Sequence, residues 1–218
     1  HNSLIMAIQI NGNGTITGIS NGGLPDGCIL DADINAMAAS KLTGALPAIS
    51  GASLTNLPAS GITMADHWRI TANFTGDSNP ISSNWERHDT SPMRTGNLGT
   101  GLTESSGEFT FPSTGWYYVY WQHALRYTGA SAWNYMVLQL DNGTGSGFSS
   151  RDYTSTEIVA HAGSSWNWLS ANQQVLIDIT STNQKMRFRV DNENGSVVTM
   201  GNTDNLDTGF SIFRLGDT

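Results

Sequence analysis

The sequence predicts an all-β protein whose larger part, residues 66–218, folds as a sandwich of two antiparallel sheets. Stretches in which large residues alternate with small or polar ones recur along this part, and this is the period of a strand with one buried face. Asn-Gly and Gly-rich turns separate the stretches. Gly, Asn, Thr and Ser are frequent, and only 13% of residues are charged against roughly 25% in average domains. Together these features favour a sandwich or jelly roll of short strands.

The alternation predicts strands at regular spacing along this part of the chain. They cover residues 67–74, 81–88, 107–111, 115–127, 133–141, 155–161, 173–180, 185–192 and 209–215. The last strand alternates small or polar residues with large ones, so we expect it to pair in the middle of a sheet.

The densest aromatic stretch, residues 106–121, is expected at the centre of the sandwich. Pro112 and Gly115 interrupt it, which indicates a strand, a tight corner and a second strand. The second strand carries large residues on both sides, since Tyr117, Val119 and Trp121 alternate with further aromatics. Such a strand is covered on both faces, and we expect a second sheet on one side and another subunit on the other.

Residues 1–65 are predicted to form a separate, extended region with one short helix. They hold no aromatic residue and one basic residue, Lys41. A hairpin is expected over 7–19 and the helix over 33–42. The stretch 42–48 returns as 54–59, with prolines that forbid helix and with evenly spaced aliphatic residues. Such a segment cannot bury its leucines alone, so we expect the chains of a trimer to intertwine here. A disordered linker is the alternative, and the frequent aliphatic residues oppose it.

Charge and composition restrict the partners and the compartment. The net charge is −8, and the 10 Lys and Arg residues are scattered, which argues against nucleic acid. No apolar run reaches the roughly 18–20 residues that span a bilayer. Residues 4–8 are too short for a secretory signal, so we expect synthesis in the cytoplasm followed by assembly. Cys28 is the one cysteine, which leaves no partner for an intrachain disulfide.

Three landmarks of the larger part resemble the complement globular-head and tumour-necrosis-factor-like jelly rolls. The stretch 107–120 reads Gly-Glu-Phe-Thr-Phe-Pro-Ser-Thr-Gly-Trp-Tyr-Tyr-Val-Tyr, 138–143 reads Leu-Gln-Leu-Asp-Asn-Gly, and 208–216 reads Thr-Gly-Phe-Ser-Ile-Phe-Arg-Leu-Gly. Thr-Asn-Gln at 182–184 departs from the family's Gly-Asp turn. The resemblance implies a compact trimer formed through aromatic faces. The residues that we assign to the trimer core are Phe109, Phe111, Trp116, Tyr118, Tyr120, Phe210 and Phe213.

The front of the chain resembles the N-termini of bacteriophage tail-fibre and virion-fibre proteins. Met-Ala-Ile-Gln-Ile-Asn-Gly at 6–12, Gly-Gly-Leu-Pro-Asp-Gly at 22–27 and the Leu-Pro-rich stretch 41–58 carry this resemblance. It implies that residues 1–65 attach to a virus particle and to its other structural proteins. The residues assigned to this virion anchor are Ile8, Ile10, Ile16, Ile19, Leu24 and Pro25.

Motifs of catalysis and metal binding are not evident in the sequence. The histidines stand at no metal-ligand spacing, and Gly-Thr-Gly-Ser-Gly at 143–147 places glycine where a nucleophile elbow needs serine. The sequence leaves one alternative open, a pair of catalytic carboxylates as in glycosidases, which requires that Asp141, Asp152 and Glu157 converge in space. We therefore expect no enzyme, no cofactor and no metal.

Aromatic residues that the sequence places near or in loops are candidates for binding a host glycan or receptor. They are Tyr127, Trp133, Tyr153, Trp166 and Trp168. A ring with a flat apolar face and a polar edge suits a pyranose. The alternative is that these rings pack at the end of the jelly roll or against a neighbouring subunit, and the two-residue spacing of Trp166 and Trp168 favours it.

These observations predict a homotrimeric virion fibre, such as a phage tail fibre, that is located in the virion. Residues 1–65 would anchor and intertwine, and the jelly-roll head, residues 66–218, would recognise the host surface. The alternatives are a capsid-decorating head fibre without a receptor and a secreted lectin-like or signalling trimer.

Overall fold

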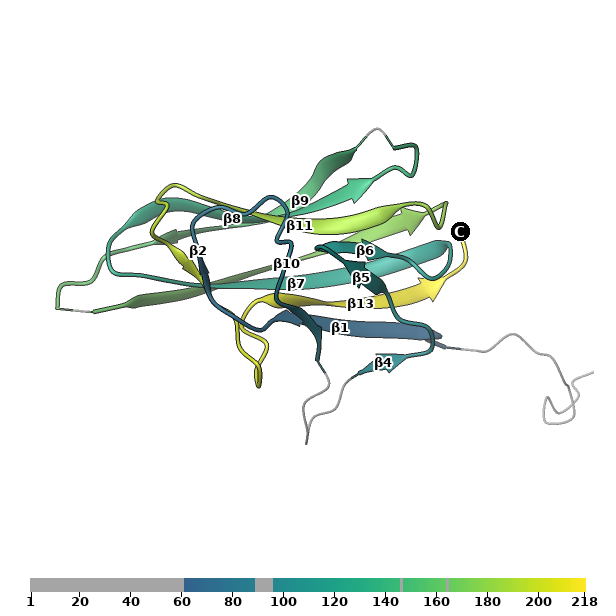
Figure 1. Ribbon diagram of the computed structural model, residues 1–218, viewed down its shortest axis with the longest axis horizontal. Helices are drawn as coiled ribbons and strands as arrows, with labels where there is room; N and C mark the ends of the chain where they lie inside the picture. Colours follow the sequence, from purple (N-terminus) through teal and green to yellow (C-terminus); the bar gives the residue numbers. More distant parts are fainter. Residues whose placement is uncertain (1–60, 89–95, 146, 164) are drawn as a thin grey trace, which may run out of the picture. The chain divides into compact units, whose positions relative to one another are not determined.

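The computed structural model describes residues 61–88, 96–145, 147–163 and 165–218, which form two antiparallel sheets packed face to face (Figure 1). The described residues contain strands and turns but no helix, which confirms the all-β sandwich. Consequently, this part of the chain holds no long apolar helix of the kind that crosses a membrane. The predicted stalk, its helix at 33–42 and its intertwined segment lie almost wholly outside the described residues.

Sheet A has eight strands in the order β2-β12-β7-β13-β1-β3, with β10 paired to β7 and β4 paired to β1. The bounds are β1 (Met64–Ile70), β2 (Phe74–Thr75), β3 (Trp85–Arg87), β4 (Asn97–Leu98), β7 (Gly115–Tyr127), β10 (Asn167–Ile179), β12 (Val198–Thr199) and β13 (Gly209–Gly216). As predicted, the C-terminal strand β13 lies inside a sheet, between β7 and β1.

Sheet B has five strands in the order β5-β6-β11-β8-β9. The bounds are β5 (Thr103–Ser105), β6 (Glu108–Thr110), β8 (Ser131–Asp141), β9 (Phe148–Ile158) and β11 (Lys185–Asn192). The outermost strand β9 pairs with β8 through a register shift opposite Leu138 and Gln139, which leaves Arg151 as the extra residue of a bulge.

The core lies between the sheets and is rich in aromatic rings. Tyr117, Val119 and Trp121 on the inner side of β7 are fully buried. Trp121 also donates a hydrogen bond from Nε1 to the carbonyl oxygen of Met136 in the opposite sheet, at 3.2 Å. The predicted cover of one side of this strand by a second sheet is therefore confirmed.

Three residues assigned to the trimer core belong instead to the interior of a single chain. Phe109, Phe111 and Phe210 are 0–2% exposed. Phe109 and Phe210 meet edge to face with centroids 4.8 Å apart, and Phe111 packs against Tyr117 at 5.0 Å. A side chain without accessible surface cannot contact a neighbouring chain, so this part of the assignment is corrected. The sequence showed that these residues face one side of a strand but not which side.

Two strands begin well before their predicted starts. The strand predicted at 155–161 is β9, which begins at Phe148, and the strand predicted at 173–180 is β10, which begins at Asn167. Serine, asparagine and glutamine interrupt the alternation of these segments, so the pattern did not reveal the strands. Backbone pairing with β8 and β7 forms them nevertheless, and β10 pairs with β7 along its whole length.

The turn between β5 and β6 requires glycine at position 107. Ser106 and Gly107 have φ angles of 55° and 83°, as in the two-residue type I′ hairpin turn. A Cβ atom on Gly107 would lie 2.1 Å from the carbonyl oxygen of Ile81. This position therefore combines a left-handed backbone conformation with a close contact to the neighbouring main chain.

Replacing Gly107 with alanine is expected to lower the free energy of unfolding by about 1–3 kcal/mol, because the new methyl group must displace main chain. The control is Gly163→Ala, where φ is 82° but no atom lies within 4 Å. Urea unfolding of both variants separates the contact from the backbone preference. Equal losses would show that the contact with Ile81 costs nothing.

Candidate functional site

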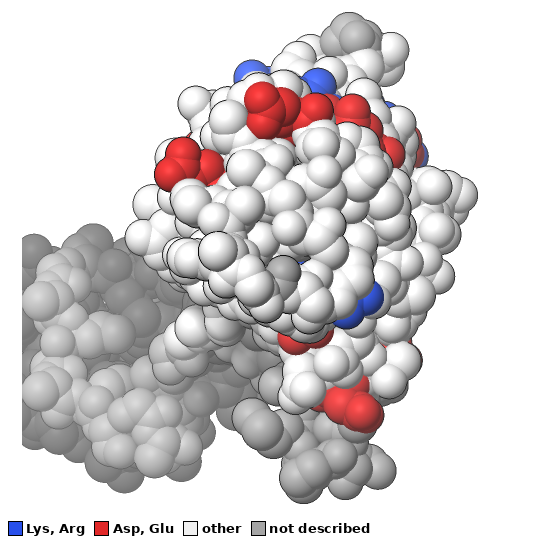
Figure 2. Space-filling view, turned by 90° about the vertical axis from the view of Figure 1, so that its left-hand side faces the viewer, with Lys and Arg blue, Asp and Glu red and all other residues white. Residues whose placement is uncertain are grey.

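The end of the sandwich seen in Figure 2 is mostly uncharged, with a band of acidic residues near the top and few basic ones. Clustered Lys and Arg of the kind that binds phosphate backbones do not appear on this face. The exposed aromatic side chains are therefore the main candidates for recognition at the surface.

The structure divides the predicted ligand-binding aromatics among three places. Trp133 and Tyr153 lie on the outer face of sheet B. Trp166 and Trp168 lie together at one end of sheet A, and Tyr127 packs against a small second hydrophobic core. All except Trp166 are on strands. The five residues therefore do not form one site; two pairs of them belong to two separate clusters, and Tyr127 stands apart.

The sheet B aromatic cluster consists of Trp133, Tyr135 and Tyr153. Trp133 and Tyr135 are stacked, with centroids 5.4 Å apart and an angle of 18° between the rings. Tyr135 meets Tyr153 edge to face at 5.2 Å and 81°. Tyr153 is 54% exposed and Trp133 is 39% exposed. Sequence reasoning missed Tyr135, although it stands two residues after Trp133 on a predicted strand and so had to share its face.

A hollow of about 280 Å³ adjoins this cluster and is lined by Tyr135, Val137, Ser150, Tyr153 and Arg189. Val137 is 4% exposed and lies directly between Arg189 of β11 and Tyr153 of β9 in the sheet register. Arg189 forms an ion pair of 2.7 Å with Asp191 on the same strand. The hollow thus combines an apolar floor and aromatic walls with one base, Arg189, whose paired acid Asp191 lies opposite Tyr135 in the sheet register.

The second cluster gathers around Arg126, near the end of β7. Its guanidinium carbon lies 4.5 Å from the ring centroid of Trp166 and 5.4 Å from that of Trp168. A shallow hollow of about 480 Å³ beside Trp168 includes Gln122, Ser170 and Asp207. The Gln122 amide is already engaged, because its Nε2 donates to the carbonyl oxygens of Leu206 and Asp207 at 3.1 Å. The cation–π contacts hold Trp166 and Trp168 against Arg126 of the neighbouring strand β7.

The sheet A apolar patch, as we name it, lies on the outer face of β7, β10 and β13. It consists of Trp116, Tyr118, Tyr120, Leu176 and Phe213. Register places Leu176 and Phe213 on either side of Tyr118. Trp116 is 43% and Leu176 is 55% exposed, and the other members are partly buried. Four members are the predicted trimer residues that remain at the surface; Leu176 had no signal in the sequence beyond the strand itself.

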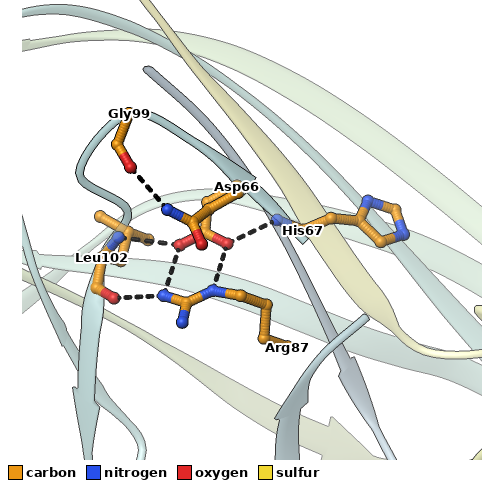
Figure 3. A network of polar contacts seen from close by, with 6 residues as sticks. Asp66, His67, Arg87, Gly99 and Leu102 are labelled. Atoms are coloured by element: carbon orange, nitrogen blue, oxygen red, sulfur yellow. Dashed lines mark hydrogen bonds and ion pairs between the residues drawn. The ribbon is translucent and has the colours of Figure 1, made fainter. Parts of the chain in front are cut away.

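A buried carboxylate joins β1 to β3 and to the segment before β5 (Figure 3). Asp66 accepts hydrogen bonds from Arg87 Nε at 2.8 Å and Nη2 at 3.0 Å. It also accepts from the backbone N–H of Leu102 at 2.8 Å and of His67 at 2.9 Å. The Asp66 side chain has no exposed surface. This network therefore fastens β1, β3 and the segment before β5 together.

His67 lies on the outer face of sheet A beside Ser211, with 2.5 Å between its Nδ1 and the serine Oγ. Burial lowers the pKa of His67, and so does the His88 ring, whose centroid is 5.0 Å away. In Figure 3 the Asp66 carboxylate points toward Arg87 and away from the His67 ring. The pair therefore lacks the carboxylate that orients the base of a catalytic triad. No pattern in the sequence predicts the contact of His67 with His88, because the two rings meet only through the pairing of distant segments.

His123 is a fully buried histidine on the inner side of β7. Its Nε2 lies 3.0 Å from the hydroxyl oxygen of Thr199. Burial lowers the pKa of His123 from 6.5 to about 3, because the interior disfavours the charged imidazolium. The ring is neutral at physiological pH and belongs to the core.

The three carboxylates left open by the sequence do not converge. Glu157 is five residues from Asp152 on β9, which is about 17 Å along a strand, whereas glycosidase carboxylates lie roughly 5–9.5 Å apart. Register places Asp152 opposite Leu138, on the other face from Asp141. Among the described residues, no three His, Cys, Asp or Glu side chains group closely enough to hold a metal ion.

Solved structures share the fold at very low sequence identity. The chain is similar to Eiger TNF from S. frugiperda, with 16% identity, a TM-score of 0.52 and coverage of 72% of this chain and 96% of that one. It is also similar to murine APRIL, with 10% identity, a TM-score of 0.52 and coverage of 70% and 98%. No protein-family model and no curated protein matches the sequence. The larger part of the chain therefore has a tumour-necrosis-factor-like jelly-roll fold.

Proposed function

We propose that this protein is a homotrimeric, non-enzymatic attachment protein whose jelly-roll head assembles through the sheet A apolar patch. The observation that carries the proposal is the exposure of Trp116 and Leu176 next to Tyr118 and Phe213 on one sheet face. Contiguous apolar surface of this kind marks contact sites. A trimer would bury this patch. It would thereby cover the outer face of the aromatic strand β7, as the large residues on both of its faces predict.

The particular role that we propose is a virion fibre, in which residues 1–65 bind the particle and the head faces the host. Support for this role comes from the sequence resemblance of the front of the chain. Three heads on one fibre would bind a host glycan or protein together, which multiplies a weak single contact. A capsid-decorating fibre without a receptor has the same architecture, and binding to host cells distinguishes the two.

A secreted signalling trimer is the second candidate, because Eiger and APRIL share the fold. At 16% and 10% identity, this similarity supports the fold and not the role. The candidates differ in what the N-terminal region binds. Co-purification of residues 1–65 with virion structural proteins would support the fibre. Absence of this protein from purified virus particles would contradict the fibre.

The trimer is tested by the mass in solution of the full chain and of residues 58–218, the compact unit that contains the sandwich. Light scattering is expected to give three times the mass of one chain for both. Leu176→Glu is expected to reduce residues 58–218 to a single-chain mass, because its charge cannot be buried between subunits. Ser149→Glu, on exposed β9, is the control and should stay trimeric. A single-chain mass for the unmodified full chain would contradict the proposal.

A further inference from the structure

We propose that the hollow beside Tyr153 on the outer face of sheet B binds a neutral hexose unit of a surface glycan. The inference rests on the proposed attachment function and assigns it a site and a ligand class. The lining residues come from three neighbouring strands, since Arg189 of β11, Val137 of β8 and Tyr153 of β9 are register partners. Rigid, paired strands hold these groups in place without a loop having to fold on binding.

The aromatic walls suit the faces of a sugar ring. Tyr135 and Tyr153 stand nearly perpendicular, at 81°, so they form two sides of a corner. Trp133 stacks on Tyr135 and so supports that wall without lining the hollow itself. A pyranose presents its C–H groups on its faces and its hydroxyls around its edge. Aromatic rings with a polar tip can therefore contact the faces and still reach the hydroxyl groups.

The polar groups indicate a neutral ligand. A sugar hydroxyl both donates and accepts hydrogen bonds, and the pair of Arg189 and Asp191 offers a donor beside an acceptor. An anionic sugar would be attracted by Arg189 but repelled by Asp191, because the Asp191 carboxylate lies 2.7 Å from the Arg189 guanidinium. Two further bases of β11 share this face. Arg187 donates to the Gln139 amide oxygen at 2.8 Å and stacks over Phe148 at 4.0 Å, and Lys185 pairs with Glu108 at 2.8 Å. Arg189 is the one charged residue among the described residues of the lining, and its ion pair with Asp191 balances its charge.

Size favours a glycan unit over a protein partner. The hollow of about 280 Å³ is smaller than the roughly 300–1,000 Å³ of sites that enclose drug-sized ligands, and it is open, as a site for one unit of a chain must be. A protein interface covers about 800 Å² on each partner. Here polar side chains flank the rings instead, because Ser149, Ser150 and Ser155 are exposed on β9.

The test is saturation-transfer NMR of the full chain with the methyl glycosides of glucose, galactose and mannose, and with glucuronic acid as the anionic probe. At least one neutral glycoside is expected to bind and glucuronic acid is not. Tyr153→Ala and Arg189→Gln should each weaken binding about tenfold or more, as loss of one stacking or charge-assisted contact predicts. Trp168→Ala removes an equally exposed tryptophan from the other cluster and should bind unchanged.

Tyr153 is largely exposed, so its variant is expected to keep the near-ultraviolet circular dichroism of a folded sandwich, and Tyr153→Phe should retain most of the binding. The site is refuted if no neutral glycoside binds, if glucuronic acid binds better, or if Tyr153→Ala binds as well as the unmodified chain. The mass in solution separates this result from the proposed function. A trimer without saccharide binding refutes the site alone, whereas a single-chain protein that binds through Tyr153 refutes the assembly alone.

Discussion

Replacing Asp66 with alanine is expected to lower the free energy of unfolding by about 3–5 kcal/mol, the usual cost of removing one partner from a buried ion pair. The carboxylate satisfies two nitrogens of Arg87 and the backbone N–H groups of Leu102 and His67. After the change, these donors lose their charged acceptor. The N–H of Leu102 is the worst placed, because its bond to Asp66 is buried.

Asp66→Asn separates charge from hydrogen bonding, since the amide keeps the size and one acceptor oxygen. Its loss is expected to be smaller than that of alanine. Asp217→Ala is the matched control, because Asp217 pairs with Arg214 but is 91% exposed, and exposed pairs contribute roughly 0–1 kcal/mol. Chemical denaturation of all three variants provides the comparison. Similar losses at both positions would show that burial of the Asp66 carboxylate does not matter.

Acidification is expected to destabilise the head through His123. The folded pKa is about 3 and the unfolded pKa is 6.5, so between these values the unfolded state binds a proton that the folded state does not. Stability is therefore complete above pH 6.5 and falls as the pH decreases toward 3. The loss from this group is about 2 kcal/mol at pH 5 and about 5 kcal/mol below pH 3. His67, whose pKa is also lowered, adds a loss of the same sign.

The measurement is the free energy of unfolding as a function of pH for the unmodified chain and for His123→Gln. Glutamine can still hydrogen-bond Thr199 but does not titrate, so its profile is expected to be flatter between pH 6.5 and 4, even if its stability at pH 8 is lower. His161→Gln replaces an exposed histidine and serves as the control. Parallel profiles for His123→Gln and the unmodified chain would show that His123 is not the group responsible.

The sequence was sufficient for the fold because its densest patterns coincide with its central strands. β7 and β11 have the predicted bounds, since large residues occupy both sides of β7 and alternate along β11. The early halves of β9 and β10 could not be predicted, because polar residues occupy them and their pairing partners come from distant segments. Periodicity reports the burial of side chains, and these strand halves are held by backbone hydrogen bonds.

The candidate sites were predictable only in part, for a similar reason. Trp133 and Tyr153 were identified by residue type, but only pairing between β8 and β9 brings them to Tyr135. The cover of the aromatic strand by a second sheet was correctly expected, and its cover by another subunit stays a prediction. Phe109, Phe111 and Phe210 were assigned to the subunit contact but are buried inside one chain. Alternation tells which residues share a face, and only the tertiary structure tells whether that face lies inward.

The bulge in β9 bears on how copies of this chain behave when crowded. β9 ends sheet B, and an outermost strand exposes N–H and C=O groups that can pair with the same strand of another molecule. Arg151, the extra residue of the bulge, interrupts this row, and the neighbouring residues are mainly serine and charged. Such strands resist edge-to-edge association and the amyloid-like stacking that follows from it. Heads held at high density would therefore not pair through their β9 edges into a continuous sheet.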